Sequence, residues 1–496
     1  MSNMNNSTRY IKRSLLAMAC ALTCLGAEAA SIVISSRDAP GVGFNDPTPV
    51  APVGGNPGTT LGEQRMYVYR YVADIWQQAL DSNATIKVSA AWEPLSCTAN
   101  SATLGSAGAW NIWHDFPGAK PGTWYPQALA NKIFGADLSA GVPDDGSGYG
   151  NVDIKTQFNI NLGNTDCLAG SGFYLGTDGN SGSKVNFVET LLHELGHGLG
   201  FSVLSVQTSS GKRILADGSA YSDLGLPSIW EGFMYDNTIG KSWLNMTSLE
   251  RKASAINPLK LAWTGANAVA GASMLSATPS VKITTPVPGA SGLYDYGSAS
   301  FGPAITTPSA LGTLAILPAA STNTLACNAF TGADISAIAG KVAIIDRGTC
   351  GFTIKVKNAQ NAGAIAVLIA DNVDAAISGL GGADPSITIP SARITKASGI
   401  TLKAAVLNAP KYGSRSTPGT VKGSWSADAS RVAGADSSGR PLLYTPNPLV
   451  GGSSVSHWDV TATPNLLMEP SINSDLGTIL VAPKDLTLPL LKDLGW

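Results

Sequence analysis

The nine residues from His193 to Phe201 constrain this chain more than any other part of its sequence. They read His-Glu-Leu-Gly-His-Gly-Leu-Gly-Phe and follow an apolar run with helical spacing. Residues four apart lie on one face of a helix, so the imidazoles of His193 and His197 can reach one metal ion. Glu194 points in an adjacent direction, where its carboxylate can accept a proton from a metal-bound water without becoming a ligand. Gly200 allows the sharp turn that ends such a helix.

Two histidines with this spacing also occur on ordinary solvated helix faces. This chain has only four histidines among 496 residues, however, and two of them stand between an apolar helical run and a glycine stop. The pattern therefore predicts a zinc site, which needs three protein ligands and a fourth position for water. The compact spacing known for such sites would place the third histidine where this chain has Val203.

Three residues elsewhere are candidates for the third ligand. We prefer His457, which stands in a Ser-His-Trp-Asp sequence and is followed by Met468 in a Leu-Met-Glu-Pro sequence. Glu231 competes with it, because a second helix could bring a glutamate to the zinc. His114 has no other histidine nearby in the sequence and is more typical of a surface or packed side chain.

These sequences around the paired histidines, His457 and Met468 resemble the leishmanolysin family of metzincin zinc proteases. The resemblance covers residues 61–201 and about 440–496. In that family an insertion separates the active-site helix from the third histidine. The resemblance implies an α+β fold, in which a twisted sheet packs with the active-site helix.

The same resemblance implies a role for each residue of the motif. The zinc ligands would be His193, His197 and His457, the general base would be Glu194, and Met468 would form the Met-turn beneath the metal. In that family an edge strand above the cleft also binds the substrate backbone by strand addition. The alternating residues 151–161 are our candidate for that strand, and a buried sheet strand is the open alternative. The sequence also predicts a helix from 61 to 80, which Thr60 could cap, and a strand from 84 to 92.

Residues 340–371 predict a strand–helix–strand unit with two continuous apolar strands. The sequence from Asp346 to Phe352, with the alanine-rich helix after it, closely resembles the protease-associated (PA) domain over residues 325–400. That family is a non-catalytic insert of secreted proteases and sorting receptors, so the resemblance implies an α/β insert for substrate guidance or protein interaction. A compact insert with adjacent ends would let the third histidine return to the zinc.

The domain boundaries follow from these motifs. We expect a signal peptide at 1–29, an extended N-terminal arm at 30–60, the first part of the catalytic domain at 61–279, the PA insertion at 280–425 and the second catalytic part at 426–496. Basic residues before an apolar run and a small-residue cleavage site at Ala29 support the signal peptide. The protein is therefore expected to be secreted.

Four cysteines remain after the signal peptide, and an even number in an exported chain suggests two disulfides. Three pairings are possible. We expect Cys97–Cys167 and Cys327–Cys350, because each pair then stays within one proposed domain.

The composition excludes several other classes of partner. A net charge of −2 gives no electrostatic case for nucleic acid or an anionic membrane, and no later stretch is long and apolar enough for a membrane anchor. Two acidic glycine-rich loops, at 144–148 and 178–182, make bound Ca²⁺ possible, although turn chemistry explains both. The oligomeric state is left open.

These observations predict a secreted zinc endopeptidase that acts on proteins or peptides. A zinc-bound water would attack the peptide bond with Glu194 as general base. Two alternatives are a non-enzymatic binding protein with a structural zinc site, and a zinc hydrolase with a substrate other than protein. An intact general base argues against a purely structural site.

Overall fold

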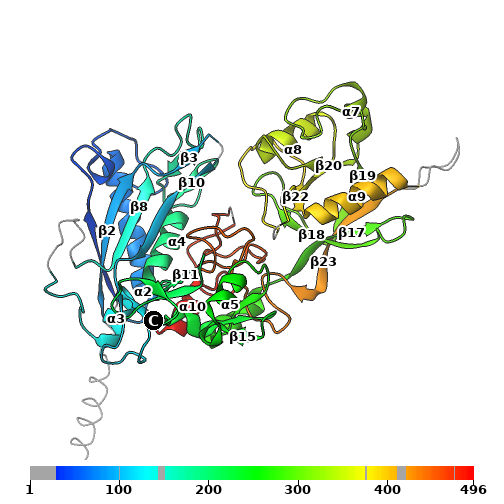
Figure 1. Ribbon diagram of the computed structural model, residues 1–496. Helices are drawn as coiled ribbons and strands as arrows, with labels where there is room; N and C mark the ends of the chain where they lie inside the picture. Colours follow the sequence, from blue (N-terminus) through cyan, green and yellow to red (C-terminus); the bar gives the residue numbers. More distant parts are fainter. Residues whose placement is uncertain (1–29, 100, 143–150, 375–376, 410–419, 474) are drawn as a thin grey trace, which may run out of the picture.

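The computed structural model describes residues 30–496 except 100, 143–150, 375–376, 410–419 and 474. The signal peptide expected at 1–29 and the acidic loop at 144–148 lie outside the described residues. Figure 1 shows two lobes, one built on an open sheet and the other on a closed barrel, with loops of the C-terminal segment between them.

The first lobe is built on a four-stranded sheet. Its strands, in spatial order, are β1 (Ser31–Ser36), β2 (Thr85–Glu93), β8 (Ile154–Asn159) and β5 (Gly105–Ala109). β1, β2 and β8 run parallel, and β5 is antiparallel to β8. Two helices, α2 (Leu61–Ala79) and α4 (Phe187–Leu199), pack against each other and against the sheet.

Helix α2 begins at the predicted position because its first turn is capped on both sides. The Thr60 side chain accepts a hydrogen bond from the Glu63 backbone N–H, and the Glu63 carboxylate accepts one from the Thr60 backbone N–H. Such a cap contributes roughly 1 kcal/mol to helix stability.

Two expectations for this lobe need correction. The segment 30–60 is not only an extended arm, because it begins with β1, which pairs along its whole length with β2. The segment 151–161 does not supply an edge strand, because β8 has a hydrogen-bonded neighbour on each side. The buried-strand alternative is confirmed, with Ile154 and Phe158 almost fully enclosed. The two edge positions belong to β1 and β5.

Aromatic side chains join the sheet to both helices. Phe187, the first residue of α4, lies with its ring centroid 4.8 Å from that of Phe158 and 5.0 Å from that of Trp92. Tyr69 of α2 packs against the same cluster at 5.9 Å from Phe187. The contact with Phe158 is edge-to-face and the other two are tilted, and together they hold α4 in a fixed position on the sheet.

The second lobe is a closed barrel of seven named strands. In spatial order they are β17 (Ala277–Thr284), β18 (Gly292–Ser298), β22 (Ser391–Ile394), β21 (Ala366–Ala370), β20 (Val342–Asp346), β19 (Ser309–Ala315) and β23 (Lys422–Val432). Its helices are α7 (Gly332–Ile338), α8 (Phe352–Asn361) and α9 (Lys396–Asn408). The predicted strand–helix–strand unit is the parallel crossover from β20 through α8 to β21.

The chain enters and leaves the barrel through one pair of strands. β17 and β23 are antiparallel neighbours, and Ala277 at the start of the first is paired with Val432 at the end of the second. The two ends of the insert therefore lie side by side, and the barrel strands extend slightly beyond the predicted limits of 280 and 425.

The remaining elements are short. All lie outside the barrel, and they are α3 (Gln127–Phe134), α5 (Ser248–Ser254), α6 (Ala266–Gly271), α10 (Thr487–Leu494), β3 (Cys97–Thr98), β4 (Ser101–Ala102), β6 (Ile112–Trp113), β7 (Tyr125–Pro126), β9 (Phe173–Tyr174), β10 (Val185–Asn186), β11 (Val206–Gln207), β12 (Lys212–Ile214), β13 (Tyr221–Ser222), β14 (Met234–Asp236), β15 (Lys241–Ser242), β16 (Leu261–Trp263) and four 3-10 turns at 43–45, 230–233, 243–245 and 272–274.

Both expected disulfides are formed. Cys97 is bonded to Cys167 beside the open sheet, and Cys327 is bonded to Cys350 in the barrel lobe. Among the described residues, no helix is both long enough and apolar enough to cross a bilayer.

A buried ion-pair network joins strand β22 and the turn after β20 to the loop after β21. The Asp371 carboxylate accepts hydrogen bonds from Arg347 at 2.9 Å and from Arg393 Nε at 2.7 Å. Burial disfavours the charged carboxylate, but the hydrogen bond of Arg347 and the charge of Arg393 outweigh it and lower the pKa of Asp371.

We expect Asp371→Asn to destabilise the protein by about 3 kcal/mol, because it leaves Arg393 buried without a counter-charge. The neighbouring exposed pair of Asp374 and Lys396 supplies the control, and Asp374→Asn should change stability by less than about 1 kcal/mol. Urea unfolding measures both. Since the pKa of Asp371 is lowered, its contribution is present above the unfolded value of about 4 and is lost as the pH falls below it. Equal stability of the two variants would contradict this account.

Candidate metal centre

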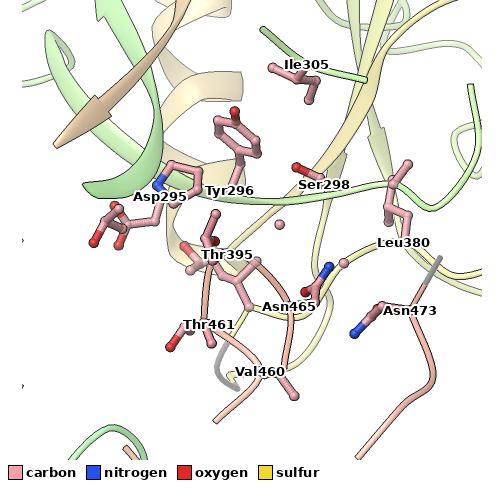
Figure 2. Close-up of a pocket in the computed structure, with 18 of the residues that line it drawn as sticks. Asp295, Tyr296, Ser298, Ile305, Leu380, Thr395, Val460, Thr461, Asn465 and Asn473 are labelled. Atoms are coloured by element: carbon pink, nitrogen blue, oxygen red, sulfur yellow. The ribbon is translucent and has the colours of Figure 1, made fainter. Parts of the chain in front are cut away.

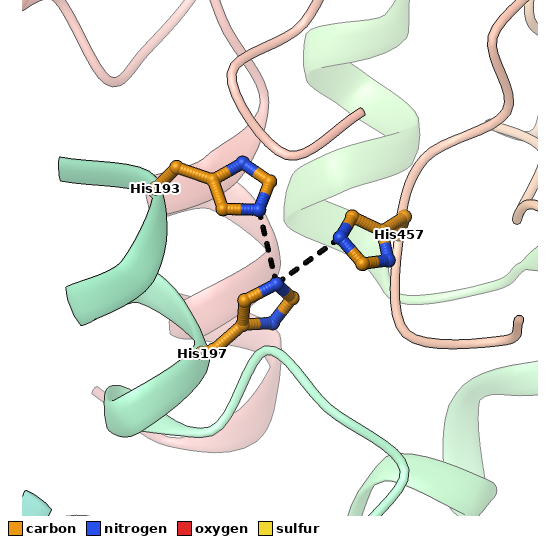
Figure 3. Close-up of side chains that lie close together, drawn as sticks. All are labelled: His193, His197 and His457. Carbon is orange, nitrogen blue, oxygen red and sulfur yellow. Dashed lines mark hydrogen bonds between the residues drawn. The ribbon is translucent and has the colours of Figure 1, made fainter. Parts of the chain in front are cut away.

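Three histidines from two distant parts of the chain converge on one point. His193 and His197 lie one turn apart on α4, and His457 comes from the C-terminal segment after the barrel. Their potential ligand atoms all lie within 4.8 Å of one another. His197 Nε2 is 3.1 Å from His193 Nε2 and 3.2 Å from His457 Nε2, as the dashed lines in Figure 3 show.

Each imidazole is oriented by a backbone carbonyl behind it. Nδ1 of His193 lies 2.7 Å from the Leu467 oxygen, and Nδ1 of His197 lies 2.7 Å from the Phe201 oxygen. Nδ1 of His457 lies 2.8 Å from the Ser453 oxygen. A carbonyl oxygen only accepts, so each Nδ1 carries the proton and donates it, and each Nε2 presents a lone pair to the other two.

Burial keeps these imidazoles neutral. It lowers the pKa of His193 to about 4 and that of His197 to about 3, and it lowers the pKa of His457 well below its usual value. Three neutral nitrogens whose lone pairs face one another suit a cation. Zinc takes neutral imidazoles at about 2.0–2.1 Å, which separates tetrahedral ligand atoms by about 3.3 Å. The donor set therefore fits zinc.

The end of α4 places the carbonyl that orients His197. Asn186 caps the start of the helix by accepting a hydrogen bond from the Val188 N–H. Gly200 ends it with a φ of 120°, a conformation that side chains rarely adopt, and so turns the Phe201 carbonyl back toward the helix.

Met468 lies against α4 between the two histidines. It is fully buried, and its sulfur would be 2.8 Å from a Cβ atom on Gly196. Only a glycine at 196 leaves room for the sulfur. The loop that carries Met468 is also tied to the third histidine, because the Trp458 N–H donates to the Met468 oxygen at 2.8 Å.

Two buried carboxylates hold the Met468 loop, and sequence reasoning missed both. Asp485 accepts a hydrogen bond from the Leu467 N–H at 2.8 Å, and Glu469 accepts one from the Leu466 N–H at 2.9 Å. Burial raises the pKa of each carboxyl. Asp485 thus holds the backbone N–H of Leu467, the residue whose carbonyl orients His193. Glu469 stands in the motif around Met468, but nothing local in the sequence marks Asp485.

Glu194 is a residue of α4, and its carboxylate contacts the edge strand β5. Burial raises the pKa of its carboxyl to about 8, and a hydrogen bond from the backbone of Ala107 in β5 opposes that rise. The side chain is therefore held beside the cluster without belonging to it. A cation on the three imidazoles would favour its ionised form.

The other sequence candidates lie outside the cluster. Glu231 is fully buried, and its carboxylate accepts hydrogen bonds from Arg213 at 2.8 Å and from Ser205 at 2.9 Å. It is therefore committed to a structural network. His114 bonds to the carboxylate of Asp115 and to a backbone carbonyl, as expected for a packed side chain.

The structure gives no support for calcium binding at the two acidic loops. In the loop at 178–182, the Asp178 side chain accepts hydrogen bonds from Tyr174 and from Asn180, which is ordinary turn chemistry. The other loop lies outside the described residues. Among those that are described, the three histidines are the one group of three or more His, Cys, Asp or Glu side chains with a shared metal-binding geometry.

Comparison with known proteins identifies the barrel lobe. Residues 310–402 match the family model of the PA domain, which confirms the insert expected from the sequence. Vacuolar-sorting receptor 3 of Arabidopsis thaliana is 46% identical over 72 residues, 13% of this chain and 12% of the receptor. A probable lipoprotein aminopeptidase, LpqL, of Mycobacterium tuberculosis is 40% identical over 67 residues, 13% of each chain. The chain thus spans about an eighth of the length of these relatives.

Solved structures give weaker likenesses. An aminopeptidase from Aneurinibacillus sp. strain AM-1 is 22% identical, with 31% of this chain and 34% of that chain covered and a TM-score of 0.20. A zinc aminopeptidase from Bacillus subtilis is 18% identical, with 33% and 36% covered and a TM-score of 0.20. A TM-score of 0.20 is too low to define a shared fold.

We expect Asp485→Ala to weaken zinc binding by about 10- to 100-fold, because outer partners that orient a metal-bound histidine have effects of that size. Asp485→Asn should lose less, since its amide oxygen can still accept from the Leu467 N–H. A zinc titration against a competing chelator measures both. Asp493→Ala is the control, because that aspartate, also near the C-terminus, binds Trp263 and Asn267 rather than the Met468 loop. Unchanged zinc affinity in Asp485→Ala would rule out the positioning role.

Gly196→Ala should destabilise the protein, although alanine ordinarily stabilises a helix relative to glycine. The new methyl group would overlap the sulfur of Met468, and overpacking of this kind costs about 1–3 kcal/mol. The double variant Gly196→Ala/Met468→Ala removes the overlap. The double variant should lose less stability than the two single variants lose in sum. Thermal unfolding of the wild type and the three variants measures these losses. Losses that simply add would contradict the contact between Gly196 and Met468.

Proposed function

We propose that this protein is a secreted, zinc-dependent endopeptidase of the metzincin type, with a PA domain inserted between its second and third metal ligands. The observation that carries the proposal is the set of three Nε2 lone pairs that face one another, with Glu194 beside them. The Met468 loop beneath α4 and the long insertion before His457 favour the leishmanolysin-like arrangement over the alternative in which Glu231 is the third ligand.

The residues of this chain take defined parts in peptide hydrolysis. Zinc, when bound, polarises the scissile carbonyl and makes water nucleophilic at neutral pH. Glu194 takes the proton from the attacking water and then delivers it to the leaving amine. The Ala107 N–H holds the carboxylate of Glu194 in place between these two transfers.

We propose that strand β5 binds the substrate backbone, in place of the segment 151–161. It is the last strand of its sheet and supplies the hydrogen bond to Glu194. An extended peptide can pair with the outer edge of such a strand, which brings a peptide bond close to the base.

Export and the PA domain fit the same proposal. Two disulfides are typical of proteins that fold in an oxidising compartment, as a secreted peptidase does. The curated relatives that share the PA region include sorting receptors, which favours a binding role for that lobe. A wholly non-enzymatic binding protein is the alternative function, and Glu194 argues against it because a structural zinc site needs no base.

Zinc content and casein cleavage of four proteins test the proposal. We expect His457→Ala to lose both zinc and activity, because only two imidazoles remain where the site needs three protein ligands. Glu194→Ala should keep its zinc and lose activity by about 10²- to 10⁴-fold, the usual contribution of a general base. Glu231→Gln is the matched control and should keep both.

Three results would contradict the proposal. Loss of zinc in Glu231→Gln alone would move the third ligand to Glu231. Casein cleavage that survives Glu194→Ala would remove the general base. A wild-type protein that holds zinc and cleaves no protein would favour the binding-protein alternative or another hydrolase.

A further inference from the structure

A cavity of about 660 Å³ lies between the barrel lobe and the C-terminal segment. Figure 2 shows its two walls: Tyr296, Ser298 and Ile305 come from the barrel side, and Val460 and Thr461 come from the segment that follows His457. Its volume is within the range of pockets that bind small molecules and short peptides.

The two walls are fixed to each other at the base of the barrel. The Ser276 N–H donates to the Thr463 oxygen at 2.7 Å, and the Ala433 N–H donates to the Ser276 oxygen at 2.9 Å. These bonds join the chain just before β17, the chain just after β23 and the wall that contains Val460. The cavity is therefore a built feature of the junction.

Its lining combines apolar surface with one unsatisfied hydroxyl. Tyr296, Ile305, Leu380 and Val460 supply apolar side chains. Ser391 also lines the cavity and is 98% buried, and its hydroxyl has no hydrogen-bond partner within the described part of the chain. A buried hydroxyl of this kind is costly to leave unpaired, and a ligand with an amide group would satisfy it.

The charges of the lining disfavour an anionic ligand. Asp295 is paired with Arg431 at 2.8 Å, and Asp374 is paired with Lys396 at 3.0 Å. The side chain of Asp475 accepts a hydrogen bond from Asn465. Among the described lining residues, the one ammonium group is therefore already paired with a carboxylate, and the lining offers phosphates and acidic peptides no further positive charge.

We propose that this cavity is a second peptide-binding site, which takes an uncharged segment of the substrate with apolar side chains. Such a segment supplies both the apolar surface and the amide groups that the lining requires. The inference rests on the proposed peptidase function, because the segment bound in the cavity belongs to the substrate that is cleaved at the metal centre. According to this inference, the junction favours substrates that are long enough to occupy both the cavity and the metal centre.

The wall of the cavity continues into the metal centre. Asn473 of the lining donates to Glu469 at 3.0 Å, and Glu469 holds the Leu466 N–H of the loop that carries Met468. On the other side, Val460 follows His457 by three residues. One short part of the chain therefore supplies both a wall of the cavity and the support of the metal centre.

Calorimetric titration with the uncharged peptide acetyl-Ala-Leu-Ala-Leu-Ala-amide tests the site in the full chain. The background variant is Glu194→Gln, loaded with zinc, so that the peptide is bound and not cleaved. We expect two peptides per chain. Adding Ser298→Trp, an exposed position on the cavity wall, should leave one. The matched control is Ser336→Trp, an exposed serine on α7 outside the lining, which should leave two.

A gentler variant tests the same site without filling it. Ser391→Ala removes the unpaired hydroxyl and should weaken one of the two binding events by about 3- to 10-fold, the usual effect of one hydrogen bond. It decides the question if Ser298→Trp does not fold. The acidic peptide acetyl-Ala-Glu-Ala-Glu-Ala-amide should not occupy the cavity.

The outcomes separate this inference from the proposed function. One peptide per chain that Ser298→Trp abolishes would support the cavity and leave the metal centre without a bound peptide. One peptide that Ser298→Trp leaves in place would overturn the cavity and keep the metal centre. Two peptides in every variant, no binding at all, unaltered affinity in Ser391→Ala or equal occupancy by the acidic peptide would each overturn the inference.

Discussion

Three hydrogen bonds from imidazole Nδ1 atoms to backbone carbonyls determine what the histidine cluster can do. They leave every Nε2 unprotonated and aimed at the other two. Each carbonyl is placed by a different device. A glycine turn places that of Phe201, the carboxylate of Asp485 holds the peptide of Leu467, and the loop before His457 supplies that of Ser453. The proposed metal chemistry therefore depends on backbone geometry in three loops as much as on the three histidines.

Local sequence was sufficient for the helix that carries the first two ligands. Spacing, an apolar face and a stop at Gly200 are all contained within a few residues, so the positions of His193, Glu194 and His197 follow from helical geometry. The capping box of Thr60 and the crossover of the PA lobe were predictable for the same reason. The match over 310–402 confirms the PA domain.

Long-range pairing was not accessible in this way. The place of β8 inside its sheet depends on β5, a glycine- and alanine-rich strand that carries no alternating signal. The role of Asp485 depends on a hydrogen bond to a peptide far along the loop. The choice of His457 over Glu231 came from a family resemblance, and the structure gives Glu231 a physical reason to be elsewhere, in its bond to Arg213. Contacts between residues far apart in the sequence produce no local periodic pattern from which they could be predicted.

The position of His457 determines when the metal centre can form. A nascent chain leaves the ribosome from its N-terminus, and the histidine pair on α4 is made before the whole barrel. Until translation has passed residue 457, the chain holds two of the three imidazoles, and its Met468 loop does not yet exist. The pairing of β17 with β23 returns the chain to the first lobe, where His457 lies beside the other two histidines. The proposed peptidase activity thus requires synthesis past residue 457, and products that stall before it could not digest the proteins around them.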